Sequence, residues 1–254
     1  MKTHIFNGLL PKDPSAPDLM FRGMNNTMCI HDNNRLKMNA AAQGLKYMFD
    51  YLEEIGVQLS HIAINIGASD GVTLDPIKFL YTQKKFKGLL IESDTAKADK
   101  IIPNLTLLGK YHDGVYPGPH GTVDILTTEV TPCNIGEIID RYLGGDLTSP
   151  PTSDNIDAIS IDIDSYDYAI LEKVIGYHPK FICVEVLEDI PPGILFEVKY
   201  DENFEYFSPS GELLLQGCSI DSVNRLAQRE GYTVFRLDWN NAYLFRHDIV
   251  DLVQ

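Results

Sequence analysis

Short apolar segments alternate with amphipathic segments from residue 61 to residue 231, and this alternation restricts the fold more than any other feature of the sequence. Continuous apolar segments are typical of strands that are buried on both faces of a parallel sheet, and the segments between them have helical spacing. The alternation predicts an α/β fold in which a doubly wound, mostly parallel sheet lies between two layers of helices. Two closely spaced apolar segments follow, so we expect an antiparallel strand at the C-terminal edge of the sheet.

The individual elements are assigned from apolar periodicity and from the residues that cap helices. Asp75 and Ser219 precede helical segments and are expected to be their N-caps. Strands are expected at 61–66, 88–92, 104–109, 156–163, 180–187, 232–239 and 242–247, and helices at 33–55, 75–86, 95–102, 134–143, 168–175 and 219–231. We therefore expect an N-terminal helical extension or cap over 1–58 and one α/β domain over 59–254.

The segment 188–217 is long for a connection between a strand and a helix. Long loops that carry aromatic side chains often act as lids or bind ligands, although a plain surface hairpin is an equally good interpretation. The aromatic residues of this segment are Phe196, Tyr200, Phe204, Tyr206 and Phe207.

Charge and composition restrict the partners. The chain has 36 acidic and 21 basic residues and a formal net charge of −15, which disfavours binding to nucleic acid or to an anionic membrane. No apolar segment approaches the roughly 20 residues of a membrane-spanning helix. The N-terminus lacks the apolar core of a secretory signal, and the four cysteines form no CxxC pair, so we expect a cytoplasmic protein with reduced thiols and no zinc site.

A glycine-containing loop, GASDG at 67–71, follows the first predicted strand at the edge where α/β sheets bind ligands. Gly67 would permit a sharp exit from the strand, and Gly71 would let a ligand approach the backbone. Ser69 stands where the second glycine of the dinucleotide-binding motif belongs, and no P-loop lysine follows, so a diphosphate is disfavoured. Glu92 ends the next strand and could accept hydrogen bonds from a ribose. The pattern fits S-adenosylmethionine, and a tight turn beside an ordinary glutamate is the alternative.

A second polar cluster lies at the end of the predicted strand 156–163. Asp162, Asp164 and Asp167 would repel one another unless a metal ion, a substrate or the cationic groups of a cofactor offset their charge. Asp167, or the neighbouring Ser165, would also suit the cap of the next helix. Glu185 ends the adjacent strand. Asp162, Asp164 and Glu185 are therefore candidate ligands of a hard cation such as Mg²⁺, although Glu185 is also suited to the polar wall of a substrate pocket.

Four segments resemble motifs of the class I S-adenosylmethionine-dependent methyltransferases, most closely the FkbM-type group. They lie at 64–76, 88–94, 156–186 and 217–248, in the order and spacing of the family, and extend over residues 60–250. Two positions depart from the pattern. Asn65 stands where many of these enzymes carry an acid, and DSYD at 164–167 stands where a glycine more often follows the acid. The resemblance implies a Rossmann-like fold and S-adenosylmethionine as the cofactor.

The resemblance also implies roles for individual residues. Gly67, Ala68 and Gly71 would pack against the methionine portion, Ser69 and Asp70 would hydrogen-bond it, and Glu92 would bind the ribose. The implied set of cofactor-binding residues is Asn65, Gly67, Ala68, Ser69, Asp70, Gly71, Glu92, Asp113 and Asp162, with Asp113 placed near the adenine because it follows the predicted third strand. Asp164 is the candidate general base, and the other candidates are His112, His120 and His178.

The activity expected from the resemblance is O-methylation of a hydroxyl on a small molecule or a sugar-containing metabolite. N-methylation is one alternative. A metal-dependent glycosyl-type transferase that uses Asp162 and Asp164 is another, and a non-catalytic protein that binds S-adenosylmethionine is a third. The partner expected first is the small-molecule acceptor, and the N-terminal helices are a candidate contact for a homo-oligomer.

Overall fold

The computed structural model describes residues 34–111, 123–144, 155–203 and 216–252. The described strands form one seven-stranded sheet. They are β1 (Ile62–Ile66), β2 (Lys87–Glu92), β3 (Val123–Thr127), β4 (Ala158–Ile161), β5 (Phe181–Glu185), β6 (Tyr232–Asp238) and β7 (Asn241–Arg246). Their spatial order is β3-β2-β1-β4-β5-β7-β6. Strands β1 to β5 pair in parallel, whereas β7 is antiparallel to both β5 and β6.

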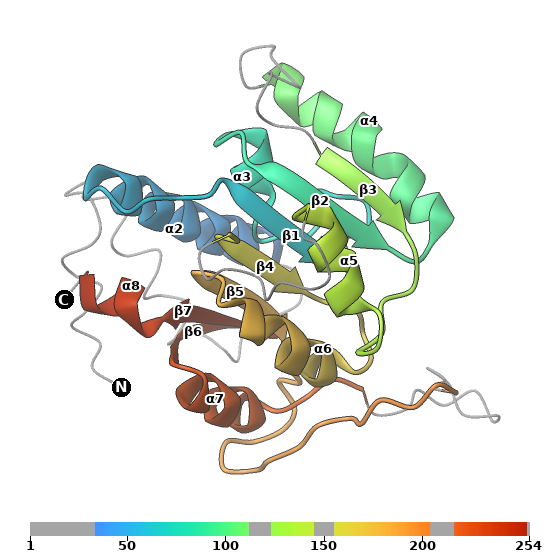
Figure 1. Cartoon of the computed structure of the whole chain (residues 1–254), viewed down its shortest axis with the longest axis vertical. Coiled ribbons are helices and arrows are strands. Elements are labelled where there is room, and N and C mark those ends of the chain that lie inside the picture. Colours follow the sequence, from blue (N-terminus) through green and yellow to red (C-terminus); the bar gives the residue numbers. More distant parts are fainter. Residues whose placement is uncertain (1–33, 112–122, 145–154, 204–215, 253–254) are drawn as a thin grey trace.

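Helices cover both faces of this sheet (Figure 1). They are α2 (Asn34–Glu54), α3 (Lys78–Thr82), α4 (Thr95–Tyr111), α5 (Ile135–Tyr142), α6 (Asp167–Val174), α7 (Ile220–Arg229) and α8 (His247–Leu252). One hydrophobic core unites α2, α3, α4 and α8 with one face of the sheet, and a second core unites α5, α6 and α7 with the other face. The expected three-layer α/β/α fold with antiparallel C-terminal strands is therefore confirmed.

Helix α7 shows how local sequence produces this packing. Val223, Leu226 and Ala227 are buried and recur at helical spacing, so one stripe of the helix faces the sheet. The side chain of Ser219 accepts a hydrogen bond from the backbone N–H of Ser222 at 3.2 Å. Ser219 is therefore the N-cap that the sequence predicts.

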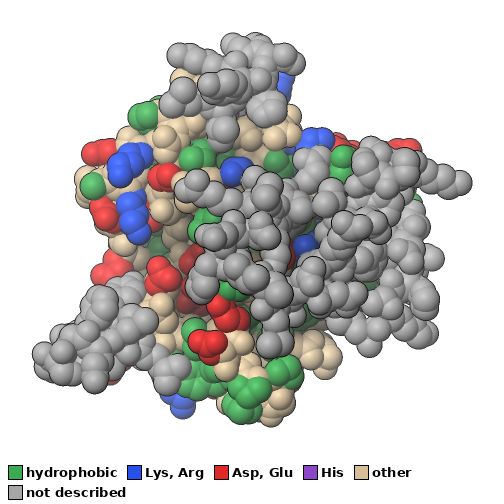
Figure 2. Space-filling view, turned by 180° about the vertical axis from the view of Figure 1, so that it is seen from behind, with side chains coloured by type: hydrophobic (Ala, Val, Ile, Leu, Met, Phe, Trp, Pro, Cys, Tyr) green, Lys and Arg blue, Asp and Glu red, His purple; other side chains and the backbone are tan. Residues whose placement is uncertain are grey.

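The described surface carries charges of both signs. Figure 2 shows acidic and basic side chains interspersed over the described part of one face, without a continuous basic stripe. Within the residues that the structure describes, no helix combines the length and the apolar character that crossing a membrane requires. The expected lack of a nucleic-acid or membrane partner stays a prediction.

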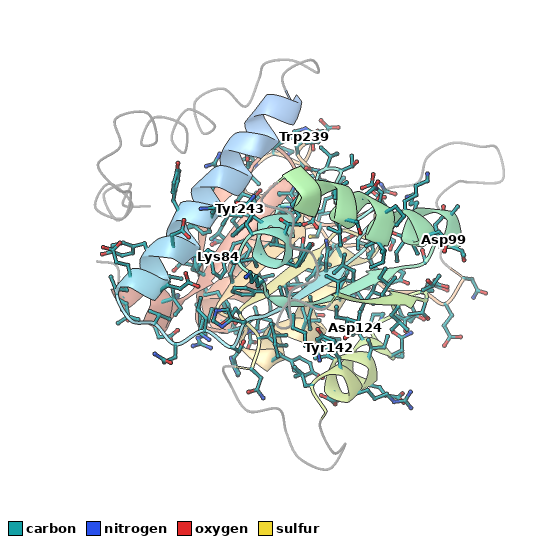
Figure 3. The ribbon with its side chains drawn as sticks, turned by 90° about the horizontal axis from the view of Figure 1, so that it is seen from above. Lys84, Asp99, Asp124, Tyr142, Trp239 and Tyr243 are labelled. Carbon is teal, nitrogen blue, oxygen red and sulfur yellow. The ribbon has the colours of Figure 1, made fainter. Side chains whose placement is uncertain are left out.

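The C-terminal part of α2 belongs to the core of the sheet domain. Phe49 contacts Phe79, Phe86 and Phe181 edge to face, with ring centroids 5.9 to 6.2 Å apart. The Nζ of Lys84 lies 2.7 Å from Asp50 and 2.6 Å from Glu53 on α2, which ties α2 to the chain after α3 (Figure 3). The division of the chain at residue 58 and the role of 1–58 stay predictions.

The predicted strand at 104–109 is wrong, because these residues continue helix α4. Ala98, Ile101 and Leu105 are buried at helical spacing and form the core-facing side of one long helix. Pro103 is exposed, so it lies away from that core. The third strand of the chain is β3, which the sequence analysis missed.

Asp75 does not cap a helix over 75–86. Helix α3 begins only at Lys78 and ends at Thr82, and its N-cap, Ile77, makes no side-chain cap. The Asp75 carboxylate instead accepts hydrogen bonds from the backbone N–H of Ile77 at 2.8 Å and from the hydroxyl of Tyr81. Burial raises the pKa of Asp75 to about 6. Asp75 therefore organises the turn that precedes the helix.

Candidate functional site

A cavity of about 380 Å³ opens at the carboxyl ends of the parallel strands. Residues from the ends of β1, β2, β4 and β5 line it, together with the chain after β3 and the turn between β6 and β7. The strand order reverses direction between β1 and β4, and open α/β sheets bind ligands at such a switch point. The position and the volume are both typical of a small-molecule site.

Gly67 makes the bend that carries the chain out of β1. Its φ is +83°, and a Cβ at this position would lie 1.7 Å from the backbone oxygen of Asp162. The N–H groups of Gly67 and Ala68 both donate to the carbonyl of Ile91 at 2.9 Å. Only glycine can therefore bring the loop this close to β4.

Glu92 is held beside this bend. Its Oε2 accepts a hydrogen bond from the backbone N–H of Ser69 at 2.7 Å, and its Oε1 accepts one from the N–H of Asp94 at 2.8 Å. The residue is buried and lines the cavity. The Ser93 hydroxyl donates a long hydrogen bond of 3.5 Å to Oε1. Each carboxylate oxygen has two lone pairs, so Oε2 can still accept a ligand hydroxyl, and a second vicinal hydroxyl could replace Ser93 on Oε1.

Asp70 and Gly71 support the loop from within. The Asp70 carboxylate accepts hydrogen bonds from the N–H groups of Val72 and Thr73 and from the Thr73 hydroxyl. Partial burial raises the pKa of Asp70, but these hydrogen bonds outweigh burial and hold the pKa below its usual value. A Cβ on Gly71 would lie 2.9 Å from Cγ2 of Ile101, so this glycine permits close packing against α4.

The side chain of Asn65 belongs to a buried hydrogen-bonded cluster with Tyr81 and Asp75. Its Nδ2 donates to the hydroxyl oxygen of Tyr81 at 3.4 Å, and Tyr81 in turn donates to Asp75. Among the described residues, Asn65, Ala68, Asp70 and Gly71 are absent from the cavity lining. Their direct contacts with a cofactor stay predictions, and the structure places them in support of the residues that line the cavity.

The acidic residues of β4 and β5 converge on the cavity. Carboxylate oxygens of Asp162, Asp164 and Glu185 all lie within 4.8 Å of one another. Burial raises the pKa of Asp162 and of Glu185, and the neighbouring carboxylates raise each pKa further. Asn240 donates a hydrogen bond to Oε1 of Glu185. The close approach of these carboxylates and their raised pKa values favour a proton held between Asp162 and Glu185.

Asp167 is separate from this group and has a structural task. Its carboxylate accepts hydrogen bonds from the backbone N–H of Ile163 at 2.8 Å and of Ser165 at 3.1 Å. Burial raises its pKa to about 6. Tyr166 is the N-cap of α6 and makes no side-chain cap, so the predicted cap role of Asp167 or Ser165 is wrong. Asp167 instead fixes the junction that presents Asp164.

Unusual backbone conformations gather at the cavity. Seven non-glycine residues in the described part of the chain have a positive φ. The four that line the cavity are Ser69, Leu74, Asp164 and Trp239. Such conformations cost free energy in residues with a side chain and are concentrated at functional sites. Leu74 and Trp239 were not among the predicted site residues, although Trp239 occupies a two-residue hairpin turn where glycine or asparagine is usual.

Four predicted site residues remain: the adenine contact Asp113 and the alternative general bases His112, His120 and His178. Asp113, His112 and His120 lie outside the described residues. His178 precedes β5 and lies at the amino edge of the sheet, opposite the cavity, so the structure rules it out as the base.

The true third strand supplies cavity residues that the sequence analysis did not find. Thr128, Glu129 and Val130 follow β3 and line the cavity. The misplaced third strand led the adenine contact to be sought at Asp113. A correct assignment of β3 would have directed attention to residues 128–130.

No protein-family model and no curated protein matches the sequence. Solved structures that resemble the fold include a SAM-dependent methyltransferase from Aquifex aeolicus, with 14% identity, a TM-score of 0.37 and coverage of 78% of this chain and 87% of that chain. A putative O-methyltransferase from Klebsiella pneumoniae has 16% identity, a TM-score of 0.41 and coverage of 94% and 92%. Magnesium protoporphyrin IX methyltransferase from Synechocystis, solved with bound SAH, has 8% identity, a TM-score of 0.44 and coverage of 92% and 98%. At these identities and TM-scores the likeness establishes neither the fold nor an activity of this chain.

Proposed function

We propose that this chain binds S-adenosylmethionine in the cavity and transfers the methyl group to a hydroxyl oxygen of a small molecule. The contact between Ser69 and Glu92 is the observation that carries the proposal. It joins the bend at Gly67 to a fixed carboxylate at the end of the neighbouring strand, which is an arrangement suited to a ribose. The FkbM-type subgroup rests on the sequence resemblance alone.

The charge of the cavity supports a cationic cofactor. Among the described residues that line it, five are carboxylates and one, Lys97, is basic. A diphosphate would be repelled by this lining, whereas the sulfonium and ammonium groups of S-adenosylmethionine would be attracted. A dinucleotide or a nucleotide sugar is therefore the weaker candidate.

The chemical step needs alignment and a proton acceptor. The acceptor oxygen attacks the methyl carbon, the carbon–sulfur bond breaks with its electron pair going to sulfur, and the hydroxyl proton goes to a carboxylate. We assign that proton to Asp162 of the Asp162–Glu185 pair. The raised pKa of Asp162 is matched to a base acting near neutral pH, and its side chain is less exposed than that of Asp164.

A divalent cation is an alternative partner for the same carboxylates. Asp162, Asp164 and Glu185 offer three oxygen ligands in one place, and hard cations prefer such ligands. A bound Mg²⁺ would take the place of the shared proton and would favour the ionised hydroxyl of the acceptor. Calorimetric titration with Mg²⁺, before and after treatment with a chelator, distinguishes the two.

The test is calorimetric binding of S-adenosylmethionine and S-adenosylhomocysteine. We expect both to bind, and we expect Glu92→Gln to weaken both about tenfold or more, because the amide loses charge-assisted hydrogen bonds. Glu137→Gln, an exposed change on α5, is the matched control and should leave both affinities unchanged. Lack of binding of either ligand to the unaltered protein, or tighter binding of a nucleotide sugar, contradicts the proposal.

A further inference from the structure

The cavity has two sides that are lined by different polar residues. Glu92 and Ser69 lie at the ends of β2 and β1. Across the switch point, Asp162 and Glu185 lie at the ends of β4 and β5. If the first side holds the cofactor, the second side must hold the methyl acceptor. The chemistry of the second side then describes the acceptor.

Two large apolar side chains are exposed at this cavity. Leu74 is 45% exposed and Trp239 is 38% exposed, and both are part of the lining. Leu74 lies in the connection between β1 and α3. Trp239, labelled in Figure 3, lies in the turn between β6 and β7. The strand order places β4 and β5 between these two connections. The acidic pair and these two apolar residues therefore line one cavity.

Both side chains stand on strained backbone. The φ of Leu74 is +59° and that of Trp239 is +54°, in the region that bulky residues avoid. A turn alone would be better served by glycine or asparagine. The residues of each turn are fixed by hydrogen bonds. The Nε1 of Trp239 donates to Glu188 at 2.7 Å, and the N–H of Val186 donates to the carbonyl of Asn240 at 2.6 Å.

The Leu74 turn is fixed in the same way. The N–H of Thr73 donates to Asp70 at 2.7 Å, and the N–H of Ile77 donates to Asp75 at 2.8 Å, so Leu74 lies between two anchored turns. Both residues thus line the cavity from turns that hydrogen bonds hold in place, despite the cost of a positive φ to the backbone. Presentation of an apolar surface to a ligand accounts for this cost, whereas the turn itself does not.

We propose that the acceptor is a planar aromatic alcohol, neutral or cationic, that lies between Leu74 and Trp239 with its hydroxyl toward Asp162. This assignment rests on the proposed function. Exposed aromatic and branched side chains favour a flat apolar body. Five carboxylates and one lysine in the described lining disfavour an acceptor that carries a carboxylate or a phosphate. The hydroxyl oxygen gains the methyl carbon from the sulfonium, and its proton passes to Asp162.

Trp239 is the only tryptophan in the chain, so its fluorescence reports on the proposed contact directly. With S-adenosylhomocysteine present, the protein is titrated with four probes: tyramine, 4-ethylphenol, 4-hydroxyphenylacetate and methyl glucoside. We expect saturable quenching by the cationic and the neutral phenol, and at least about tenfold weaker binding of the anionic phenol and of the sugar. Equal or tighter binding of the anion or the sugar overturns the assignment, as does a lack of saturable quenching by both tyramine and 4-ethylphenol.

Variants separate a binding role from a structural one. Trp239→Gly and Leu74→Gly each relieve the strained φ, so neither should unfold the protein. We expect each to weaken tyramine binding about tenfold, measured by calorimetry, while the melting temperature stays equal or rises. Lys85→Gly is the matched control, because Lys85 has a φ of +58° and lies outside the cavity lining. Unchanged tyramine affinity in both cavity variants overturns the assignment.

The same titrations tell this inference apart from the proposed function. If tyramine quenches Trp239 but neither S-adenosylmethionine nor its product binds, the methyltransferase proposal fails and the aromatic ligand stands. If the cofactor binds but both neutral and cationic phenols fail, the acceptor assignment alone fails.

Discussion

Two carboxylate sites lie at the same edge of the sheet and differ in what stabilises their negative charge. Glu92 receives a backbone N–H on each oxygen, whereas Asp162 and Glu185 face each other with Asp164 beside them. Glu92 is buried, whereas Asp162 and Glu185 are partly exposed to the cavity. Backbone donors make the first site a fixed acceptor of hydrogen bonds. Mutual repulsion makes the second site one that holds a proton and can exchange it.

Gly67 joins the two sites, because its bend lies against the backbone oxygen of Asp162. Gly67→Ala should have the largest effect of all, a loss of about 3 kcal/mol or more in the free energy of unfolding, because a Cβ would overlap the backbone of β4 and the φ is unfavourable. Urea denaturation measures this loss. Gly56→Ala is the matched control, since its φ is +86° but nothing lies within 4 Å of the added Cβ. Equal losses in both variants would show that the two sites are not coupled through this contact.

The two acidic residues of β4 and its following loop can be compared directly. Asp162→Asn should lower kcat about 100-fold or more, because the proton acceptor is lost, and should change the affinity for S-adenosylhomocysteine little. Asp164→Asn should lower kcat less than about tenfold, since that side chain is exposed. The rate of S-adenosylhomocysteine formation with tyramine as acceptor measures both. A larger effect at Asp164 would return the role of base to that residue.

The last prediction concerns the pH dependence of stability, where the effect within any one pH unit is smaller than the effects above. The pKa of Glu185 is raised in the folded protein, so the folded state holds a proton that the unfolded state releases above pH 4.5. The contribution of Glu185 to the free energy of unfolding is therefore fully present below pH 4.5. It is lost as the pH rises through the raised pKa of the folded state. Relative to Glu185→Gln, the unaltered protein should lose up to about 1.4 kcal/mol per pH unit in this range.

Melting temperatures from pH 4.5 to pH 9 measure this difference, with Glu137→Gln as a variant whose slope should match that of the unaltered protein. A wild-type curve parallel to that of Glu185→Gln would mean that the pair holds no extra proton. The Glu92 site and the Asp162–Glu185 pair would then differ only in their hydrogen-bond geometry, not in their protonation.

Several features of the site follow from local sequence. The bend at Gly67 and the acid at the end of β2 could be placed because a buried strand, a glycine and a polar residue have a fixed order along the chain. Ser219 could be identified as a cap for the same reason. The strand at 104–109 could not be assigned correctly, because one apolar segment fits either period and only packing on the sheet decides between them.

The sequence by itself determined the layered α/β fold, the order of its elements apart from β3, and the residues at the ends of β1, β2, β4 and β5, since these depend on periodicity and on local turn chemistry. Tertiary structure alone decided that Glu92 accepts two backbone N–H groups and that Asp162 meets Glu185. It also decided that Leu74 and Trp239 reach the same cavity. These contacts join positions that are distant in the chain, and their strain and their pKa shifts arise only from the burial and the close approach that the folded sheet imposes.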